Sequence, residues 1–261
     1  MTNILDAIYK QKRIELIEEK KRYSYKSLEK LLDKNKKRNF KKLLINSQLE
    51  KNNNIIAEIK KASPSAGIIV NDYIPEDIAM KYEKSGVGAI SILTEQNFFK
   101  GHIDHLSLVH KYSTLPILRK DFIFDPYQIL QSKIYHADAI LLILSILSDN
   151  QIIELIDIAE NCNLDCLIEI HTKNELERAM KIGYPIIGVN NRNLKTLDVS
   201  DNTINIVSKF TKDFTFVAES GIKTHDQIKK YNDAGIFNFL IGESILKSTN
   251  ISKKIMKLKG L

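Results

Sequence analysis

Two charged side chains stand two positions apart in a mostly apolar stretch of the chain. They are Glu58 and Lys60, within the segment 57–65. In an extended strand, residues two positions apart point to the same side, so both charges would face one site. A surface ion pair is the ordinary alternative and would stabilise the protein little. Lys61 is better placed for that solvent-facing role, so the pattern favours a functional pair.

A lysine and a glutamate further along the chain each stand at the end of a short apolar run. They are Lys120 and Glu169. A lysine among carboxylates in a partly closed site can act as a general acid, or can lose its proton and form a Schiff base. With Glu58 and Lys60, these residues supply two cations and two anions that can divide acid and base roles.

The elements that must position these side chains repeat along the chain from residue 55 onward. Each repeat is a short apolar run, a turn and an amphipathic segment. The predicted strands cover residues 55–60, 89–94, 116–120, 138–144, 165–170, 185–190, 214–219 and 237–242, with helices such as 76–84 and 151–161 between them. Near-continuous apolar strands are typical of a parallel sheet with both faces buried.

Eight such units favour a closed (β/α)8 TIM barrel of the α/β class. An open doubly wound sheet is the alternative, although it would place more strands than usual in one sheet. In a barrel all strands end at one face, where Asn190, Arg192 and Glu219 would join the four charged side chains. A purely structural protein has little reason to place so many carboxylates and lysines on one rim.

The last two predicted strands are followed by small and polar residues that suit an anion. Ser220 and Gly221 follow the seventh strand, and Gly242, Glu243 and Ser244 follow the eighth. Glycines let the backbone approach an anion, and N–H groups at the start of a helix point towards it. Each motif alone occurs in ordinary turns, but the pair at successive strand ends predicts a phosphate site.

The N-terminal part of the chain has a helical pattern instead of the strand repeat. Apolar residues such as Ile4, Leu5 and Ile8 recur at helical spacing among lysines and glutamates. We therefore predict an N-terminal helical extension over residues 1–49 and a (β/α)8 barrel over residues 50–261. The two parts together would form one structural domain.

The composition disfavours several other classes of protein. Hydrophobic residues make up 43% of the chain, which is ordinary for a globular protein. The net charge of +7 comes largely from lysine-rich surface segments without a nucleic-acid-binding motif, so we expect no nucleic-acid partner. No apolar run approaches the roughly 18 residues of a spanning helix, and no secretory signal is recognisable. We expect a cytoplasmic protein with no membrane partner.

The cysteines and histidines give no sign of a metal or a cofactor. Cys162 and Cys166 are expected to be reduced thiols. His102, His105 and His110 lack the spacing and the nearby carboxylate of a zinc site, so we expect them to be surface residues. Because the chain also lacks a glycine-rich nucleotide motif, we predict neither a metal nor a cofactor.

Seven segments, in this order along the chain, resemble the motifs of the indole-3-glycerol phosphate synthase family. They are residues 56–65, 91–95, 118–122, 167–171, 188–194, 219–222 and 241–244, and the resemblance covers nearly the whole chain. It implies a TIM barrel whose helical extension packs beside the mouth and helps to cover the substrate. It also implies conversion of 1-(2-carboxyphenylamino)-1-deoxyribulose 5-phosphate to indole-3-glycerol phosphate, carbon dioxide and water, in tryptophan biosynthesis.

The same resemblance implies roles for individual residues. Lys120 would protonate the substrate carbonyl oxygen during ring closure, and Lys60 would neutralise the substrate carboxylate. Glu169 and Glu58 would manage the later proton transfers, while Asn190 would orient the substrate and the catalytic groups. The substrate and its phosphate would be bound by Ser63, Arg192, Glu219, Ser220, Gly221, Gly242, Glu243 and Ser244. Apolar walls for the aromatic ring would come from Phe98, Phe99, Phe122, Leu141 and Leu194.

The expected partner is a small phosphorylated substrate, and the chain would act as a monomer or a weak homodimer. Another phosphate-binding barrel enzyme is the alternative: phosphoribosylanthranilate isomerase, or an aldolase that forms a Schiff base on Lys120. The isomerase would be expected to use a cysteine and an aspartate at strand ends. Here Cys166 lies in mid-strand near Glu169, which disfavours it.

Overall fold

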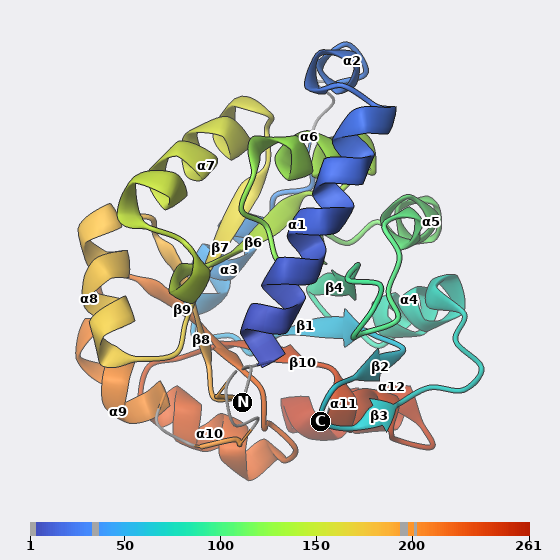
Figure 1. The fold of residues 1–261 in the computed structure, drawn as a ribbon. Coiled ribbons are helices and arrows are strands. Elements are labelled where there is room, and N and C mark those ends of the chain that lie inside the picture. Colours follow the sequence, from blue (N-terminus) through green and yellow to red (C-terminus); the bar gives the residue numbers. More distant parts are fainter. Residues whose placement is uncertain (1–3, 33–36, 194–197, 201–202) are drawn as a thin grey trace.

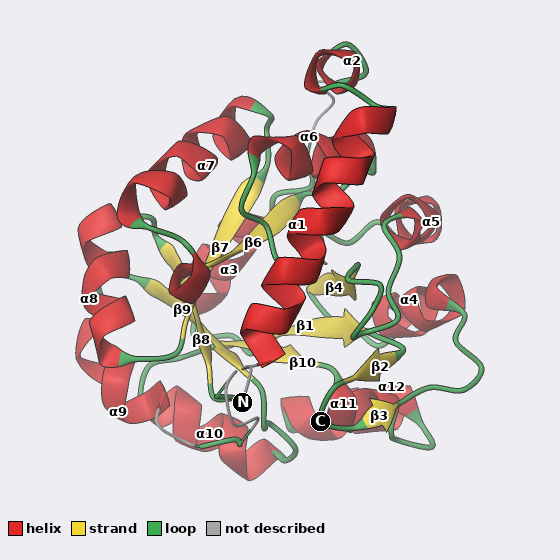
Figure 2. Ribbon diagram, in the orientation of Figure 1, coloured by secondary structure: helices red, strands yellow, loops and turns green. Residues whose placement is uncertain are grey.

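The computed structural model describes residues 4–32, 37–193, 198–200 and 203–261. Eight parallel strands close into a barrel, in the order β1-β10-β9-β8-β7-β6-β5-β4. Their bounds are β1 (Asn54–Ile59), β4 (Ala89–Leu93), β5 (Ile117–Lys120), β6 (Ala139–Ile143), β7 (Asp165–Ile170), β8 (Ile186–Asn190), β9 (Thr215–Glu219) and β10 (Asn238–Ile241). The predicted (β/α)8 barrel is confirmed, and each predicted strand corresponds to one of these eight (Figure 2).

Helices surround the barrel and separate its strands along the chain (Figure 1). Their bounds are α1 (Ile4–Arg22), α2 (Tyr25–Glu29), α3 (Phe40–Leu49), α4 (Pro75–Lys84), α5 (Asp104–Tyr112), α6 (Pro126–Ile134), α7 (Asp149–Asn161), α8 (Lys173–Ile182), α9 (Thr203–Val207), α10 (His225–Asp233), α11 (Glu243–Leu246) and α12 (Ile251–Lys259). Short elements lie between them: the 3-10 turns η1 (Leu144–Ile146) and η2 (Ser208–Phe210), and the antiparallel pair β2 (Ala62–Ser63) and β3 (Gly67–Ile68). None of the described helices is long and apolar enough to cross a membrane.

The barrel strands are buried along almost their whole length, which explains their near-continuous apolar sequences. Four strands, β1, β4, β6 and β10, end one residue earlier than predicted. Strand β1 ends at Ile59 and β10 ends at Ile241, so Lys60 and Gly242 lie just beyond the strands. The ladder between β1 and β4 ends at the pair Ile59 and Ile92. Lys60 and Gly242 therefore belong to the loops that shape the barrel mouth.

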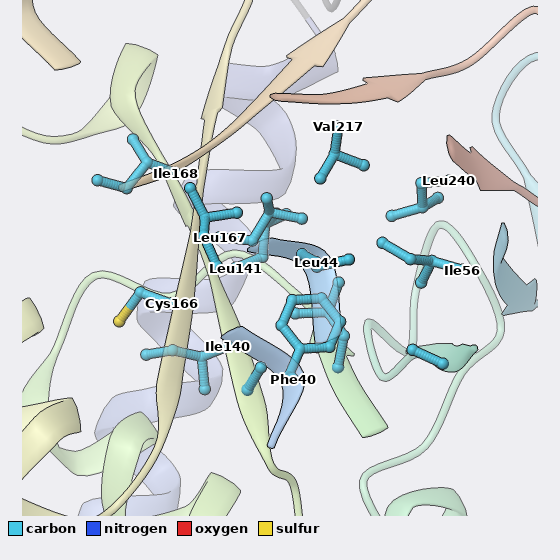
Figure 3. Packing of buried hydrophobic residues seen from close by; sticks show 14 of the residues in the cluster. Phe40, Leu44, Ile56, Ile140, Leu141, Cys166, Leu167, Ile168, Val217 and Leu240 are labelled. Atoms are coloured by element: carbon cyan, nitrogen blue, oxygen red, sulfur yellow. The ribbon is translucent and has the colours of Figure 1, made fainter. Parts of the chain in front are cut away.

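Helix α3 closes the end of the barrel where the strands begin. Its Phe40 and Leu44 are fully buried and lie among strand residues such as Leu141 in the barrel interior (Figure 3). Asp165, the first residue of β7, accepts a hydrogen bond of 2.8 Å from the backbone N–H of Lys41. A buried carboxylate at a strand start thus ties the first turn of α3 to the barrel.

Helix α1 crosses the opposite end of the barrel, where the strands finish (Figure 1). Its Leu5 and Ile8 are buried against the barrel core. Further along the helix, Lys12 Nζ lies 3.0 Å from Asp121 Oδ1, and both side chains are buried. The resemblance implied an extension beside the mouth, but the structure divides it. Helix α1 lies at the mouth, and α3 lies at the other end.

Leu44→Ala should lower the free energy of unfolding by about 2 to 5 kcal/mol, because it leaves a cavity in a tightly packed core. Leu49→Ala removes a side chain of the same helix that is 75% exposed. That control should change the free energy of unfolding by no more than about 0.5 kcal/mol. Urea unfolding followed by circular dichroism measures both values. Equal losses would contradict the placement of α3 in the barrel end.

Candidate active site

A cavity of about 770 Å³ opens at the mouth of the barrel. Each of the eight barrel strands contributes at least one residue to its walls, and α1 covers one side. The predicted site residues that line it are Glu58, Lys60, Ser63, Lys120, Phe122, Leu141, Glu169, Asn190, Arg192, Glu219, Ser220, Gly221, Gly242, Glu243 and Ser244. The barrel therefore brings together residues that are far apart in the sequence.

Lys120, the last residue of β5, lies between two carboxylates. Its Nζ is 2.7 Å from Glu169 Oε2 and 3.2 Å from Glu219 Oε2. Both glutamates are buried, and the lysine is nearly so. Burial disfavours the charged amine, but Glu169, Glu219 and Glu58 outweigh it and raise the pKa of Lys120. The lysine therefore stays protonated, so it carries a proton and does not favour Schiff-base formation.

The two carboxylates beside Lys120 have opposite pKa shifts. Burial acts to raise the pKa of Glu169, but Lys120 and His171 outweigh it and hold that pKa below its usual range. Burial raises the pKa of Glu219 to about 8, with a further contribution from Glu169, although Lys120 opposes both. Near neutral pH, Glu169 is therefore an ionised base while Glu219 keeps a proton.

Two glycines make room for the buried carboxylates. A Cβ atom at Gly242 would lie 2.5 Å from Glu58 Oε1, and one at Gly188 would collide with the carboxylate of Glu219. Glu58 Oε1 is in turn 2.5 Å from Lys60 Nζ. A larger residue at either position would displace a carboxyl group of the site. Gly242 thus has a steric role as well as the predicted place beside an anion.

The turn after β9 forms another part of the cavity wall. Ser220 and Gly221 both have positive φ angles, of 64° and 80°, in the left-handed region that glycine adopts most readily. Ser220 Oγ donates a hydrogen bond of 2.8 Å to Asn190 Oδ1. The same oxygen accepts the backbone N–H of Arg192 at 3.0 Å. Asn190 therefore holds the turn after β9 and the loop after β8 in a fixed relation.

Arg192 links these loops to the rest of the rim. Its Nη1 donates to Ser65 Oγ at 3.0 Å, and its Nη2 lies 3.9 Å from Glu243 Oε2. Ser244 Oγ donates to the carbonyl oxygen of Ile222 at 2.8 Å. The loops after β1, β8, β9 and β10 thus form one polar wall. We call "polar wall" the residues Ser63, Ser65, Asn190, Arg192, Ser220, Gly221, Gly242, Glu243 and Ser244.

The apolar walls differ in part from the prediction. Phe122 and Leu141 line the cavity, and so does Phe99, whose ring centre is 6.4 Å from that of Phe122. Phe98 packs against the core instead and is not on the cavity wall. Leu194 lies outside the described residues. Adjacent residues in a turn point in different directions, so the sequence could not tell which phenylalanine faces the cavity.

Some residues of the cavity wall were not named among the predicted site residues, although the resemblance implied that the extension helps to cover the substrate. Ile4, Leu5 and Ile8 of α1 line the cavity, although the sequence pattern identified them only as one face of a helix. Helical periodicity shows that a face is buried but not which surface it covers. Asp121, which also lines the cavity and anchors α1, follows Lys120 directly and had no separate signal.

Among the described residues, no group of three or more histidine, cysteine, aspartate or glutamate side chains is arranged to hold a metal ion. Cys162 and Cys166 are both free. Burial raises the pKa of the Cys166 thiol, so it is an unreactive core residue.

The fold and the site define a (β/α)8-barrel enzyme whose strand ends carry a buried lysine–glutamate cluster beside a polar wall. A family model described as indole-3-glycerol phosphate synthase matches residues 5–258. The indole-3-glycerol phosphate synthase of Acetivibrio thermocellus is 44% identical, over 99% of this chain and 100% of its own length. That of Zymomonas mobilis subsp. pomaceae is 40% identical over the full length of both chains. The chain belongs to the indole-3-glycerol phosphate synthase family.

A solved structure supports the fold independently. The crystal structure of KGPDC from Streptococcus mutans matches with a TM-score of 0.61, over 80% of this chain and 96% of that chain. The sequences are only 14% identical, so the likeness extends to the barrel fold and not to the activity.

Lys12→Met should loosen α1 over the mouth, because it breaks a buried ion pair and removes one of the cations beside Asp121. Amide hydrogen exchange in α1 should become at least about tenfold faster, since the local opening becomes easier. Lys10→Met, at an exposed position of the same helix, should leave the exchange unchanged. Equal protection of α1 in the wild type and in Lys12→Met would show that other contacts hold the helix.

Proposed function

We propose that this chain catalyses the indole-3-glycerol phosphate synthase reaction. It would convert 1-(2-carboxyphenylamino)-1-deoxyribulose 5-phosphate to indole-3-glycerol phosphate, with loss of carbon dioxide and water. The observation that carries the proposal is the trio of Lys120, Glu169 and Glu219, which supplies a cation, a base and a bound proton in one cavity. Membership of the family supports the same assignment.

The cavity suits the two ends of this substrate. The polar wall offers the guanidinium of Arg192, hydroxyl groups and glycine backbone to a phosphate. Phe122 and Leu141 offer an apolar surface to the aromatic ring. Lys60 lies on the same cavity wall and would neutralise the carboxylate that the ring carries. The substrate would therefore lie across the mouth, with its reacting carbons beside Lys120.

Ring closure would be the first chemical step. The ring carbon that bears the carboxylate attacks the carbonyl carbon, a C–C bond forms, and positive charge develops on the nitrogen. The carbonyl oxygen becomes a hydroxyl by taking a proton from Lys120, which the ionised Glu169 holds charged until that point. Donors placed in advance towards a developing charge lower the barrier because little reorganisation is needed.

Decarboxylation and dehydration would follow. Loss of carbon dioxide returns the bonding electrons to the ring and neutralises the nitrogen. The new hydroxyl then leaves as water, while a base removes a proton from the carbon next to the nitrogen, which completes the indole. Glu169 is ionised and suits the base, whereas the proton on Glu219 is available to the leaving hydroxyl. Glu58, paired with Lys60, is the second carboxylate for these transfers.

The alternative barrel activities receive less support from the same geometry. A Schiff-base aldolase needs a neutral lysine, but the carboxylates around Lys120 favour its charged form. An isomerase with a catalytic cysteine needs a thiol in the site, but Cys166 is buried within β7 and is not on the cavity wall.

We also propose that the enzyme acts in the cytoplasm as a monomer or a weak homodimer. Its cysteines are free, which fits a reducing compartment. Residues of the extension such as Leu5 and Phe40 share one core cluster with the barrel, so the two parts would fold as one structural domain.

The direct test is a fluorescence assay of the purified protein, because indole formation changes the emission. We expect turnover of the carboxyphenylamino-deoxyribulose phosphate without an added metal or cofactor. Absence of turnover by a protein that is folded by circular dichroism would end the proposal. A stable adduct on Lys120 after borohydride treatment with substrate would favour the aldolase instead.

Lys120→Ala and Glu169→Gln should each lower kcat about 100-fold or more, because each removes a proton-transfer group. KM should change much less, since both groups act mainly in the transition state. Lys111→Ala, at an exposed position of α5, should behave as the wild type. Losses confined to KM would mean that Lys120 and Glu169 serve binding and not chemistry.

Arg192→Ala should raise KM about 10- to 100-fold, because a hydrogen bond to a charged group contributes about 1.5 to 3 kcal/mol. The effect on kcat should be smaller, since the phosphate does not react. Arg22→Ala, an exposed residue at the end of α1, is the control for loss of one positive charge. An unchanged KM for Arg192→Ala would remove this residue from the phosphate site.

A further inference from the structure

The second oxygen of Glu169 faces a charged pair that the mechanism above does not use. Lys120 approaches Oε2 of Glu169, whereas His171 Nε2 lies 3.3 Å from Oε1. On the other side of the imidazole, His171 Nδ1 lies 3.6 Å from Glu175 Oε2. Lys120, Glu169, His171 and Glu175 thus form a series of alternating charges that leads from the cavity to the start of α8.

The local backbone fixes the imidazole between the two carboxylates. His171 follows the end of β7, and Glu175 lies in the first turn of α8. Glu175 Oε2 accepts the backbone N–H of His171 at 2.6 Å, and Thr172 caps the helix by accepting the N–H of Glu175 at 3.2 Å. The His171 side chain is only 11% exposed and does not line the cavity. It can therefore influence the substrate only through Glu169.

The charge of the imidazole depends on both glutamates. Burial opposes the charged form, but Glu169 and Glu175 together raise the pKa of His171 to about 9. Arg178, one turn further along α8, is engaged elsewhere, by Asp149 at 2.7 Å and by carbonyl oxygens of η1 and the residue after it. Near neutral pH, His171 is a cation that stabilises the ionised form of Glu169.

We propose that His171 is a positioning residue, which keeps Glu169 ionised and directed into the cavity, and that Glu175 keeps the imidazole charged for this purpose. The proposal rests on the proposed synthase reaction, in which Glu169 acts as a base. Two ion pairs hold Glu169, one from the cavity and one from behind. When Lys120 gives up its proton to the substrate, His171 remains as a cation beside the carboxylate. The site then retains an ionised base for the later steps.

The pH profile of kcat separates this role from simple packing. An opposite charge at this distance lowers a carboxyl pKa by about one unit or more, so its loss raises that pKa. In His171→Asn the acid limb of the profile should therefore move up by about one pH unit or more. KM should stay within about twofold of the wild type, since the residue does not line the cavity. His102→Asn, an exposed histidine, is the matched control.

Glu175→Gln tests the outer part of the series without touching the imidazole. It should move the acid limb of the kcat profile to higher pH, by less than His171→Asn does, because loss of the Glu175 charge lowers the pKa of His171. Glu177→Gln removes an exposed carboxylate from the same helix and should leave the profile unchanged. This second pair keeps the test valid even where His171→Asn folds poorly.

Imidazole titration by NMR tests the charge of His171 independently of turnover. The signal that His171→Asn lacks should titrate near pH 9 in the wild type and at lower pH in Glu175→Gln. Any of three results would overturn the proposal. The acid limb could be unchanged in His171→Asn, the effect of that substitution could be confined to KM, or His171 could titrate near its ordinary pKa. If the wild type gives no product, the proposed reaction fails, and the titration alone decides whether His171 is the charged neighbour of Glu169.

Discussion

The buried charge of Lys120 is the constraint on which the rest of the site depends. An ammonium group removed from water is stable only where carboxylates compensate for the lost hydration. Glu169 of β7 supplies this negative charge at 2.7 Å, and an oxygen of the protonated Glu219 of β9 lies 3.2 Å from the ammonium group. Burial, with a further contribution from Glu169, disfavours ionisation of Glu219, whereas Lys120 and His171 keep Glu169 ionised. The site therefore holds a base and a proton donor side by side.

The closed barrel brings the lysine and the two glutamates together. Parallel strands that close on themselves bring Lys120, Glu169 and Glu219 from β5, β7 and β9 to one mouth. Gly188 of the intervening β8 leaves space for the Glu219 carboxylate. Helix α1 covers the mouth and limits access of water to the charges, while α3 closes the other end. Helices α1 and α3 thus contribute to the environment of the site as well as to the apolar core.

Much of this arrangement could be predicted from the sequence, for a physical reason. Strands buried on both faces are continuous apolar runs, and charged residues at their ends stand out against them. Lys120, Glu169 and Glu219 could be found in this way. Their pairing could not, because it depends on the order of strands and the stagger of the closed barrel. For the same reason, the separate positions of α1 and α3 had no local signal. The spacing of two between Glu169 and His171, the same as between Glu58 and Lys60, is by contrast a local signal for their contact. The choice between Phe98 and Phe99 depended on the path of one turn.

In the proposed complex the two ends of one cavity bind the two ends of one substrate, and a crystal structure with bound indole-3-glycerol phosphate tests this arrangement most directly. The phosphate should lie against the polar wall, within hydrogen-bonding distance of the turn at Ser220 and Gly221 and of Arg192. The indole ring should lie against Phe122, beside Lys120 and Glu169. A phosphate bound beside Lys120, or an indole ring outside the barrel mouth, would contradict this arrangement.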